Sequence, residues 1–295
     1  MNLDFLPPPP LTKINHPAIS PSRIKLYMLR LDLMHPLFGG NKWFKLKYNL
    51  QEAENTGHNR ILTFGGPWSN HLAALAQTHG ILHNMEMIGV IRGEKPTTFS
   101  PTLKGCEEKG MILEFISRSQ YREKNLPLPL NFLKKKFGDC YLIPEGGANF
   151  LGEKGCSEIP HFINMPYDYI CTPIGTGTTF SAISSKVDEK IVSVGFTVVK
   201  NDLSLMKLFE PQPFSKKSIK VINNYHFGGF ARVTDDLRTF KSDFESHTGI
   251  TLDYIYTSKM MYGIFDLIAK GFFRENTTIV ALHTGGLQGN IGFES

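Results

Sequence analysis

Cysteine is scarce in this sequence, and its few occurrences lack the spacings that bind a metal ion or form a redox pair. The four cysteines are Cys106, Cys140, Cys156 and Cys171, and no two of them form a C-x-x-C pair. This disfavours a zinc ribbon, a thioredoxin-like motif and other cysteine-based metal sites, so we expect no metal ion. Unpaired thiols are usual in a reducing compartment, and a cytoplasmic location is the default expectation.

Long apolar runs and strong charge are also missing. No run reaches membrane-spanning length, and residues 1–10 lack the basic segment and apolar core of a secretory signal peptide. The formal charge of +5 arises from 32 basic and 27 acidic residues spread along the chain, with only short clusters such as 134–136. Neither zinc-finger spacing nor an aromatic-basic RNA-binding motif is present. We therefore expect no membrane partner and no nucleic-acid partner.

The rest of the composition is that of a globular protein with a large core. At 295 residues, 41% hydrophobic and 20% charged, the chain is long enough for one or two domains. Short β-type runs alternate with segments of helical pattern, which predicts α/β layers with open, mostly parallel twisted sheets and helices on both faces. The expected strands are residues 60–64, 85–91, 111–116, 140–143, 169–172, 191–199, 254–256 and 278–283, and the expected helices include 72–79 and 98–109. A proline-broken stretch at 126–130 is expected to be a loop.

The stretch GGNKWFK, residues 39–45, lies between an apolar, strand-like run and a helical pattern. The helical pattern rests on apolar residues at three-and-four spacing: Trp43, Leu46, Leu50 and Ala53. Asn41 is a good N-cap, and the two glycines before it allow tight backbone geometry. Lys42 is thus expected at a loop-to-helix junction, where a lysine side chain can point into a cleft.

Lys42 and Lys45 are one helical turn apart, so both ammonium groups can face the same small ligand. A reactive amine beside a fixed positive charge suits a cofactor that carries an aldehyde and a phosphate, and we expect pyridoxal 5'-phosphate. The motif by itself also fits a turn followed by a solvated lysine. Motifs elsewhere in the chain are therefore needed to distinguish a cofactor-binding lysine from a solvated one.

Three further strand-to-helix junctions carry glycine, serine or threonine, and in open parallel sheets ligands bind at such junctions. In the first, residues 65–71, Ser69 is expected to cap a helix whose backbone N–H groups can bind the carboxylate of an amino-acid substrate. Asn70 and His71 add side chains that can hydrogen-bond the phenolic oxygen of the cofactor or the substrate. The alternative is that Ser69 only caps the helix.

The next junction, residues 173–179, follows an apolar strand. It contains a glycine-rich turn and hydroxyl side chains, namely Gly175, Thr176, Gly177, Thr178 and Thr179. Backbone N–H groups and the positive end of the following helix would make this turn a phosphate cradle. It is not a Walker loop, because no Gly-Lys-Ser/Thr follows. An ordinary tight turn between strand and helix is the alternative.

The last junction, residues 253–259, places Tyr256 at the end of an expected strand, where its hydroxyl can act as an acid or base. Thr257 could offer its hydroxyl to a ring nitrogen. A lone tyrosine of this kind is otherwise a core or rim residue. Residues 282–286 close the last strand with two glycines that permit close approach of a flat ring, and His283 is expected to be a packed strand residue.

In this order, GGNK-x-x-K, GG-x-x-SNH, the Gly175 loop and Tyr256 resemble the 1-aminocyclopropane-1-carboxylate deaminase/D-cysteine desulfhydrase family of pyridoxal-phosphate-dependent enzymes. The resemblance covers residues 29–286. It implies the tryptophan synthase β-like fold (PLP fold type II), with a large cofactor-binding domain formed by residues 1–43 and 151–295. A smaller α/β domain, 44–150, is inserted between them. The family also implies a homodimer.

The resemblance assigns the cofactor contacts by position. Lys42 resembles the family's lysine that binds the cofactor aldehyde covalently, and Lys45 resembles a ligand of its phosphate. Residues 175–179 resemble the main phosphate loop. Asn70 matches the asparagine beside the phenolic oxygen, and Thr257 is placed near the ring nitrogen.

The resemblance also assigns the catalytic residues and the contacts of the substrate. Lys42 and Tyr256 match the lysine and the tyrosine of the family's active site, and Ser69 matches the serine near the reacting centre. These three are therefore implied as catalytic. Ser69, Asn70 and His71 are implied as contacts of a small amino-acid substrate.

Thr257 distinguishes the two activities named in the family. Deaminases carry glutamate after the tyrosine, which can keep the pyridine nitrogen protonated and the ring a strong electron sink, as opening of a cyclopropane ring demands. β-Elimination of a thiol demands less, so a threonine matches the desulfhydrase side. Phe230 is a second departure: if it replaces the tyrosine that many members present in this loop, one hydroxyl contact to the substrate is lost.

The expected activity is therefore pyridoxal-phosphate-dependent β-elimination on a small amino acid, with D-cysteine converted to pyruvate, ammonia and hydrogen sulfide. A 1-aminocyclopropane-1-carboxylate deaminase or an amino-acid racemase of the same fold is an alternative that uses the same Lys42. A non-catalytic carrier of the cofactor or an amino-acid-binding protein is the alternative of another class. Intact Ser69, Asn70 and Tyr256 argue against it.

Overall fold

The computed structural model describes residues 6–35, 39–80, 85–200, 209 and 218–293. The chain packs into two units. The central unit is Lys42–Gly155, and the terminal unit combines Leu6–Asn41 with Cys156–Glu294. These units are defined by packing alone. The division into a cofactor-binding domain of residues 1–43 and 151–295 and an inserted domain of 44–150 stays a prediction.

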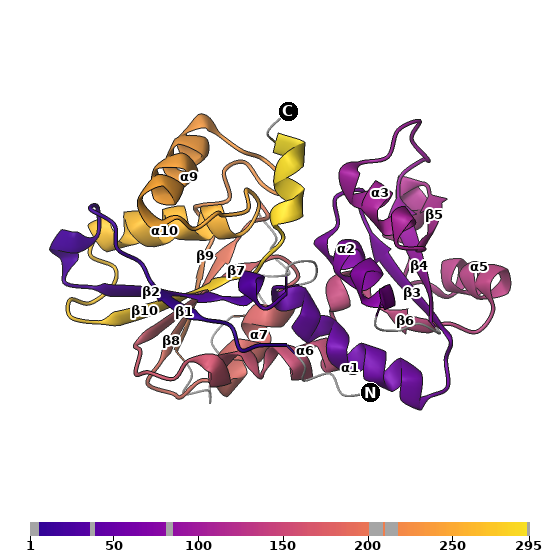
Figure 1. Cartoon of the computed structure of the whole chain (residues 1–295), viewed down its shortest axis with the longest axis horizontal. Helices are drawn as coiled ribbons and strands as arrows, with labels where there is room; N and C mark the ends of the chain where they lie inside the picture. Colours follow the sequence, from indigo (N-terminus) through magenta and orange to yellow (C-terminus); the bar gives the residue numbers. More distant parts are fainter. Residues whose placement is uncertain (1–5, 36–38, 81–84, 201–208, 210–217, 294–295) are drawn as a thin grey trace. The chain divides into compact units, whose positions relative to one another are not determined.

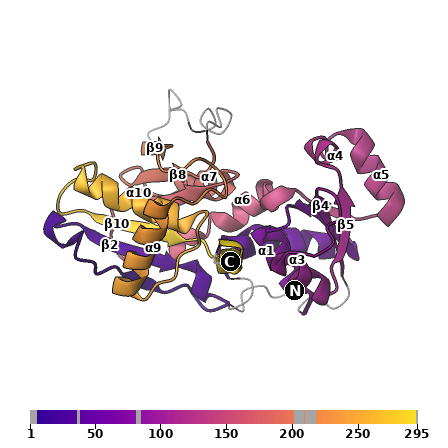
Figure 2. The ribbon, with the colours of Figure 1, turned by 90° about the horizontal axis from the view of Figure 1, so that it is seen from above.

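The terminal unit is built on a six-stranded sheet (Figure 1). Its order is β1 (Leu11–Lys13), β2 (Lys25–Arg30), β10 (Thr278–His283), β7 (Tyr169–Ile174), β8 (Val192–Thr197) and β9 (Ser218–Ile222). The edge strand β1 pairs antiparallel with β2, and every other pair is parallel. β2 and β10, from opposite ends of the sequence, run side by side (Figure 2). β7 is buried along its whole length, as expected for a central parallel strand covered on both faces.

Helices cover both faces of this sheet. They are α7 (Thr178–Lys186), α9 (Asp235–Thr248) and α10 (Thr257–Ala269), with 3₁₀ turns at Ser20–Ser22, Leu31–Leu33, Ile159–Phe162 and Leu287–Phe293. Phe244 of α9 and Ile264 of α10 share one hydrophobic cluster with Cys171 of β7. Phe180 of α7 shares another with Ile174. Cys171 and Ile174 occupy odd and even positions of one strand, so the two clusters lie on opposite faces.

The central unit is built on a four-stranded, fully parallel sheet. Its order is β5 (Ile112–Ile116), β4 (Glu86–Arg92), β3 (Arg60–Gly65) and β6 (Tyr141–Ile143). Its helices are α1 (Asn41–Asn55), α2 (Asn70–Gln77), α3 (Pro101–Glu108), α4 (Arg118–Arg122) and α5 (Pro127–Phe137), with 3₁₀ turns at Thr78–Gly80 and Glu145–Gly147. The helix α6 (Phe150–Cys156) ends the unit.

The helical periodicity after the GGNK motif is confirmed in α1. The four apolar residues of the predicted stripe, Trp43, Leu46, Leu50 and Ala53, are all buried. The predicted fold class is confirmed as well, because both sheets are mostly or wholly parallel and α/β in arrangement. Within the described part of the chain, no helix is both long and apolar enough to cross a membrane.

Two local predictions are wrong. Residues 254–256 form a turn rather than a strand, because the Asp253 carboxylate accepts the backbone N–H groups of residues 255–257, which a strand needs for its neighbour. Residues 126–130 are not a loop, because α5 begins at Pro127. Proline is tolerated in a first helical turn, since the N–H groups there have no partner within the helix.

Candidate active site

The predicted site residues fall in two sets, one in each unit. The central unit carries Lys42, Lys45, Ser69, Asn70 and His71, and the terminal unit carries Gly175, Thr176, Gly177, Thr178, Thr179, Tyr256 and Thr257. The chain passes from the terminal to the central unit between Asn41 and Lys42, at the start of α1. The contacts that each set makes within its own unit show what that set can bind.

Asn41, which belongs to the terminal unit, is bonded to two loops of the same unit. The Asn41 backbone N–H donates to the Thr284 carbonyl over 3.2 Å, and the Asn41 side-chain amide donates to the Thr179 hydroxyl over 3.0 Å. Gly40 has a φ of +104°, and a Cβ there would meet the Thr284 carbonyl, so only glycine fits. The helix begins at Asn41 with Gly40 before it, so the prediction of Asn41 as the N-cap is off by one position.

Lys42 and Lys45 lie on the first turns of α1, as predicted. Lys42 is partly exposed and Lys45 is buried. A Cβ on Gly147, which has a φ of +67°, would lie 2.9 Å from the Cβ of Lys45, so the turn after β6 packs directly on this lysine. Both lysine charges act on the imidazole of His71. The structure therefore brings Lys42, Lys45 and His71 into one neighbourhood of the central unit.

Ser69 caps α2, as the sequence predicted. Its Oγ accepts the backbone N–H of Leu72 over 3.2 Å. A Cβ on Gly65, the last residue of β3, would meet both the Leu72 side chain and the Ser69 Oγ, so strand and helix come together closely at this turn. The first backbone N–H groups of α2 point out of the helix, the geometry that binds anions elsewhere. Binding of the substrate carboxylate here stays a prediction.

His71 is held in one tautomer. The Thr63 hydroxyl donates its single proton to the Ile143 carbonyl over 2.8 Å, so it can only accept from His71 Nε2, which lies 2.9 Å away. Nε2 is therefore protonated and Nδ1 carries the lone pair. That Nδ1 is buried and has no hydrogen-bond partner among the described residues. This Nδ1 is thus a buried acceptor in the neighbourhood of the two lysines.

The charge state of His71 follows from its surroundings. Burial, and then the positive charges of Lys42 and Lys45, lower the pKa of His71 from 6.5 to about 3. The imidazole is therefore neutral near neutral pH. It can accept a hydrogen bond at Nδ1, but it cannot neutralise a carboxylate.

The glycine loop after β7 has the features of an anion site. Gly177, with a φ of +87°, is the N-cap of α7 and has no side chain with which to cap this helix. Thr178 and Thr179 are buried, and the hydroxyls of Thr176 and Thr178 lie 3.0 Å apart. Backbone N–H groups at an uncapped helix start are the usual ligands of phosphate.

Tyr256 lies directly on this loop. A Cβ at Gly175 would stand 3.0 Å from Tyr256 Cε1 and 3.3 Å from the hydroxyl oxygen, so the absence of a side chain at 175 makes room for the ring. The Phe230 ring stands edge-on to Tyr256, with centroids 6.1 Å apart. The structure therefore brings the predicted tyrosine, the predicted phosphate loop and Phe230 together.

Asp253 sets the position of Tyr256, and the sequence analysis did not single it out. Its buried carboxylate accepts the backbone N–H groups of Ile255, Tyr256 and Thr257 over 2.8–3.0 Å. It also accepts the Thr257 hydroxyl over 2.6 Å. An aspartate just before a helical pattern is the usual residue for such a cap, and this pattern could have identified it.

The Thr257 hydroxyl has a partner within the terminal unit. Its one proton goes to Asp253, and its oxygen accepts the Asp253 backbone N–H over 2.9 Å. A bond to a ring nitrogen would have to compete with this pairing, and that role of Thr257 stays a prediction.

Lys259 was also missed. It is 1% exposed, and its Nζ donates to the carbonyls of His226 and Gly229 over 3.0 and 2.8 Å. Burial lowers the pKa of Lys259 from 10.5 to about 8, and the nearby Asp253 partly opposes this shift. Through its two hydrogen bonds, Lys259 anchors the loop that places Phe230 beside Tyr256.

His283 is confirmed as a packed residue of β10. It is fully buried, and its Nε2 donates to the Thr251 carbonyl over 2.8 Å. Its Nδ1 accepts the backbone N–H of Gly285 and lies 3.2 Å from the Asp32 carboxylate. His283 thus fixes the glycine turn that follows the strand.

Comparisons with known proteins agree with these motifs, although no protein-family model matches the chain. A bifunctional D-cysteine desulfhydrase/1-aminocyclopropane-1-carboxylate deaminase from Arabidopsis thaliana is 27% identical over 317 residues, covering 96% of this chain and 77% of the relative. A D-cysteine desulfhydrase of Salmonella paratyphi A is 23% identical over 305 residues, covering 95% and 92%.

A solved structure described as that of an ACC deaminase homologue (ACC is 1-aminocyclopropane-1-carboxylate) has the same fold. It superposes with a TM-score of 0.82 at 25% identity, covering 97% of this chain and 92% of that one. Two further solved enzymes share the fold at lower identity. An O-acetylserine-dependent cystathionine β-synthase from Helicobacter pylori matches with a TM-score of 0.69, and a hydrogen sulfide-producing enzyme from Fusobacterium nucleatum matches with a TM-score of 0.68. The order of the motifs, the two largely parallel sheets and these relatives all indicate the same group of enzymes. The chain is therefore similar to the 1-aminocyclopropane-1-carboxylate deaminase/D-cysteine desulfhydrase family of pyridoxal-phosphate-dependent enzymes.

Proposed function

We propose that this enzyme catalyses β-elimination on a small amino acid, with D-cysteine as the candidate substrate. One molecule of water is consumed, and pyruvate, ammonia and hydrogen sulfide are released. The observation that carries the proposal is the start of α1. Asn41 is bonded to Thr179 of the glycine loop and to Thr284, and Lys42 is the next residue. The candidate reactive amine thus follows directly on the residue that joins both loops.

The glycine loop fits the phosphate of the cofactor. A side chain at Gly175 would strike Tyr256, and the N-cap residue of α7 is a glycine without a capping side chain, so backbone N–H groups of the first turn would bind the anion. Lys42 would hold the aldehyde, Lys45 would add a positive charge near the phosphate, and Asn70 would bind the phenolic oxygen. When bound, the cofactor supplies the electron sink for the substrate α-carbon.

Proton transfer falls to Lys42 and Tyr256. The amine of Lys42 or the Tyr256 oxygen would take the proton from the substrate α-carbon, and the thiol would then leave from the β-carbon. The ring of Tyr256 is fixed by its contact with the loop at Gly175 and by Phe230, which keeps its hydroxyl in one place. Positioned acid-base groups of this kind contribute about 10²–10⁴-fold to a rate.

The substrate carboxylate would bind at the start of α2. Since His71 is neutral, the attraction would come from the backbone N–H groups of the first turn, the Ser69 hydroxyl and the Lys42–Lys45 neighbourhood. The lone pair of His71 Nδ1 suits an N–H or O–H donor of the ligand.

Thr257 favours desulfhydrase over deaminase activity. A neutral residue stands where the family's deaminases carry glutamate, and its proton is bonded to Asp253. Phe230, an apolar ring, stands beside Tyr256 and adds no hydroxyl there. The neutral Thr257 suits an elimination that needs a weaker electron sink than cyclopropane opening, whereas Phe230 bears only on the contacts of the substrate. A homodimer and a cytoplasmic location stay predictions.

Borohydride trapping tests the role of Lys42. We expect the reduced wild-type enzyme to carry the cofactor on the peptide that contains Lys42, and Lys42→Ala to lose both this adduct and nearly all turnover. Lys104→Ala, at an exposed lysine of α3, is the matched control and should behave as wild type. If Lys42→Ala still carried the reduced cofactor, on another lysine, the assignment of Lys42 as the residue that binds the cofactor would be wrong.

A product screen tests the substrate. Hydrogen sulfide released from D-cysteine, measured against L-cysteine and other paired D- and L-amino acids, would support the proposal. Formation of α-ketobutyrate from 1-aminocyclopropane-1-carboxylate without hydrogen sulfide release would favour the deaminase instead. A yellow protein without turnover on the panel would point to a cofactor carrier.

A further inference from the structure

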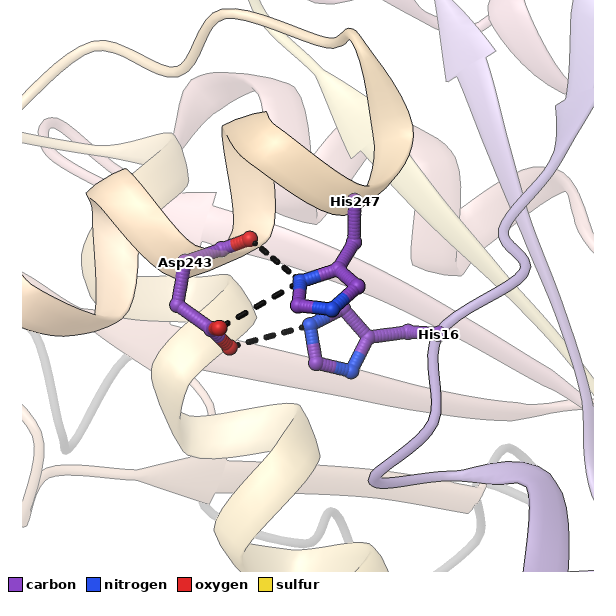
Figure 3. A group of neighbouring side chains, drawn as sticks. All are labelled: His16, Asp243 and His247. Carbon is purple, nitrogen blue, oxygen red and sulfur yellow. Dashed lines mark hydrogen bonds and ion pairs between the residues drawn. The ribbon is translucent and has the colours of Figure 1, made fainter.

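His16, Asp243 and His247 form a side-chain cluster on the terminal unit (Figure 3). His16 lies between β1 and the first 3₁₀ turn, and Asp243 and His247 are one turn apart on α9. Asp243 Oδ2 lies 3.1 Å from His16 Nε2, and Asp243 Oδ1 lies 3.3 Å from His247 Nδ1. One ligand atom from each residue lies within 4.8 Å of the other two. None of these residues takes part in the proposed reaction.

The spacing of these atoms suits a tetrahedral metal ion. Ligand atoms roughly 2.0–2.2 Å from a tetrahedral zinc ion are about 3.3–3.6 Å apart. The two carboxylate–imidazole distances, 3.1 and 3.3 Å, lie near this range but run to different oxygens of Asp243. With one oxygen as the ligand, the three ligand atoms lie within 4.8 Å of one another, so they have to move closer together to reach tetrahedral spacing. We propose that this cluster binds one divalent transition-metal ion of the zinc class.

The surroundings of the cluster combine a fixed ligand with open access. The His16 ring is 5% exposed and stands edge-on to Phe265, with centroids 4.9 Å apart, and stacked near Phe244. Asp243 and His247 have side chains that are 50% and 41% exposed, so an ion and a water molecule can reach them. Two imidazoles, a carboxylate and water form a ligand set that zinc accepts readily.

The protons in the cluster set the expected affinity. The backbone N–H of Ala18 donates to His16 Nδ1 over 3.2 Å, so the proton of a neutral ring lies on Nε2, facing Asp243. His247 Nδ1 lies 2.9 Å from the Asp243 carbonyl and carries a proton as well. An ion has to displace both protons and break the Ala18 bond, because each imidazole must offer a lone pair. We therefore expect micromolar rather than nanomolar binding.

A bound ion would tie two distant parts of the sequence together. His16 precedes β2, and Asp243 lies 227 positions later, on a helix that packs against the sheet. Since the ion binds the folded chain in preference to the unfolded chain, it raises the melting temperature. The expected effect is stabilisation of the segment before β2 against α9, independent of turnover.

Calorimetric titration of the cofactor-loaded enzyme with Zn²⁺ tests this site, after bound metal has been removed with a chelator and the chelator dialysed away. We expect one ion per chain with a micromolar Kd, together with a rise in melting temperature of a few degrees. His247→Ala and Asp243→Asn, both at exposed positions, should weaken binding at least about tenfold and abolish the thermal shift.

His161→Ala, at an exposed histidine of the same unit, is the matched control and should bind as wild type. Equal Zn²⁺ binding by wild type and His247→Ala would show that the ion is held elsewhere, and this would overturn the proposal. Absence of saturable binding at up to about 1 mM Zn²⁺ would do the same, leaving only hydrogen-bonded side chains without a metal site.

Discussion

The neutral state of His71 predicts a specific pH dependence of stability. In the unfolded chain this histidine binds a proton below about pH 6.5, whereas in the folded chain it does so only below about 3. Between these values the unfolded state holds the extra proton, so stability is complete above about pH 6.5 and falls as the pH is lowered. Each pH unit in this window corresponds to about 1.4 kcal/mol. Lowering the pH from 7 to 5 should therefore cost about 2 kcal/mol through His71 alone.

Urea unfolding of wild type and His71→Gln at both pH values measures this contribution. Other groups titrate in both proteins, so the relevant quantity is the difference between their losses of unfolding free energy. We expect wild type to lose about 2 kcal/mol more than His71→Gln between pH 7 and pH 5. Equal losses would refute the reasoning, because they would mean that His71 takes up a proton in the folded chain. The Thr63 bond would then not fix its tautomer.

Two other predictions concern the surroundings of Tyr256. Gly175→Ala places a Cβ 3.0 Å from the Tyr256 ring, so we expect turnover to fall about tenfold while the melting temperature changes little. Gly105→Ala, where a Cβ meets nothing within 4 Å, is the control and should keep the turnover of wild type. An unchanged turnover rate in Gly175→Ala would show that the position of Tyr256 does not affect the reaction. Since the folded pKa of Lys259 is about 8, below 10.5 when unfolded, wild type should gain stability between pH 8 and 10 relative to Lys259→Met. The prediction would be contradicted if the difference between the urea midpoints of wild type and Lys259→Met were the same at pH 8 and at pH 10.

Local patterns in the sequence predicted the parts of the site that depend on neighbouring residues. The apolar spacing from Trp43 to Ala53 identified α1 and so placed Lys42 and Lys45 on one helix, and the serine before a helical pattern identified the cap at Ser69. Each of these features involves side chains within a few turns of one another. Periodicity and capping preferences describe such interactions directly.

The turn at 254–256 was missed although its cause is local, because one carboxylate, that of Asp253, binds three successive backbone N–H groups. Features that depend on folding of distant segments were not predictable. Burial of Lys259 depends on carbonyls about thirty positions earlier in the chain. The expectation that no metal ion binds considered cysteine spacing alone, whereas the proposed zinc-class site joins His16 to Asp243. Sequence spacing contains no information on such pairs.

The bond between Asp253 and Thr257 restricts how this enzyme can change in evolution. Replacing Thr257 with glutamate, the residue that we expect at this position in the family's deaminases, would remove the hydroxyl that Asp253 accepts and set two carboxylates together at a position with no solvent exposure. Replacing Asp253 first would release the N–H groups that hold Tyr256. Either single step is harmful, so the two positions are epistatic. A change to glutamate at position 257 would therefore require a simultaneous change at 253 or a compensating cation acquired first.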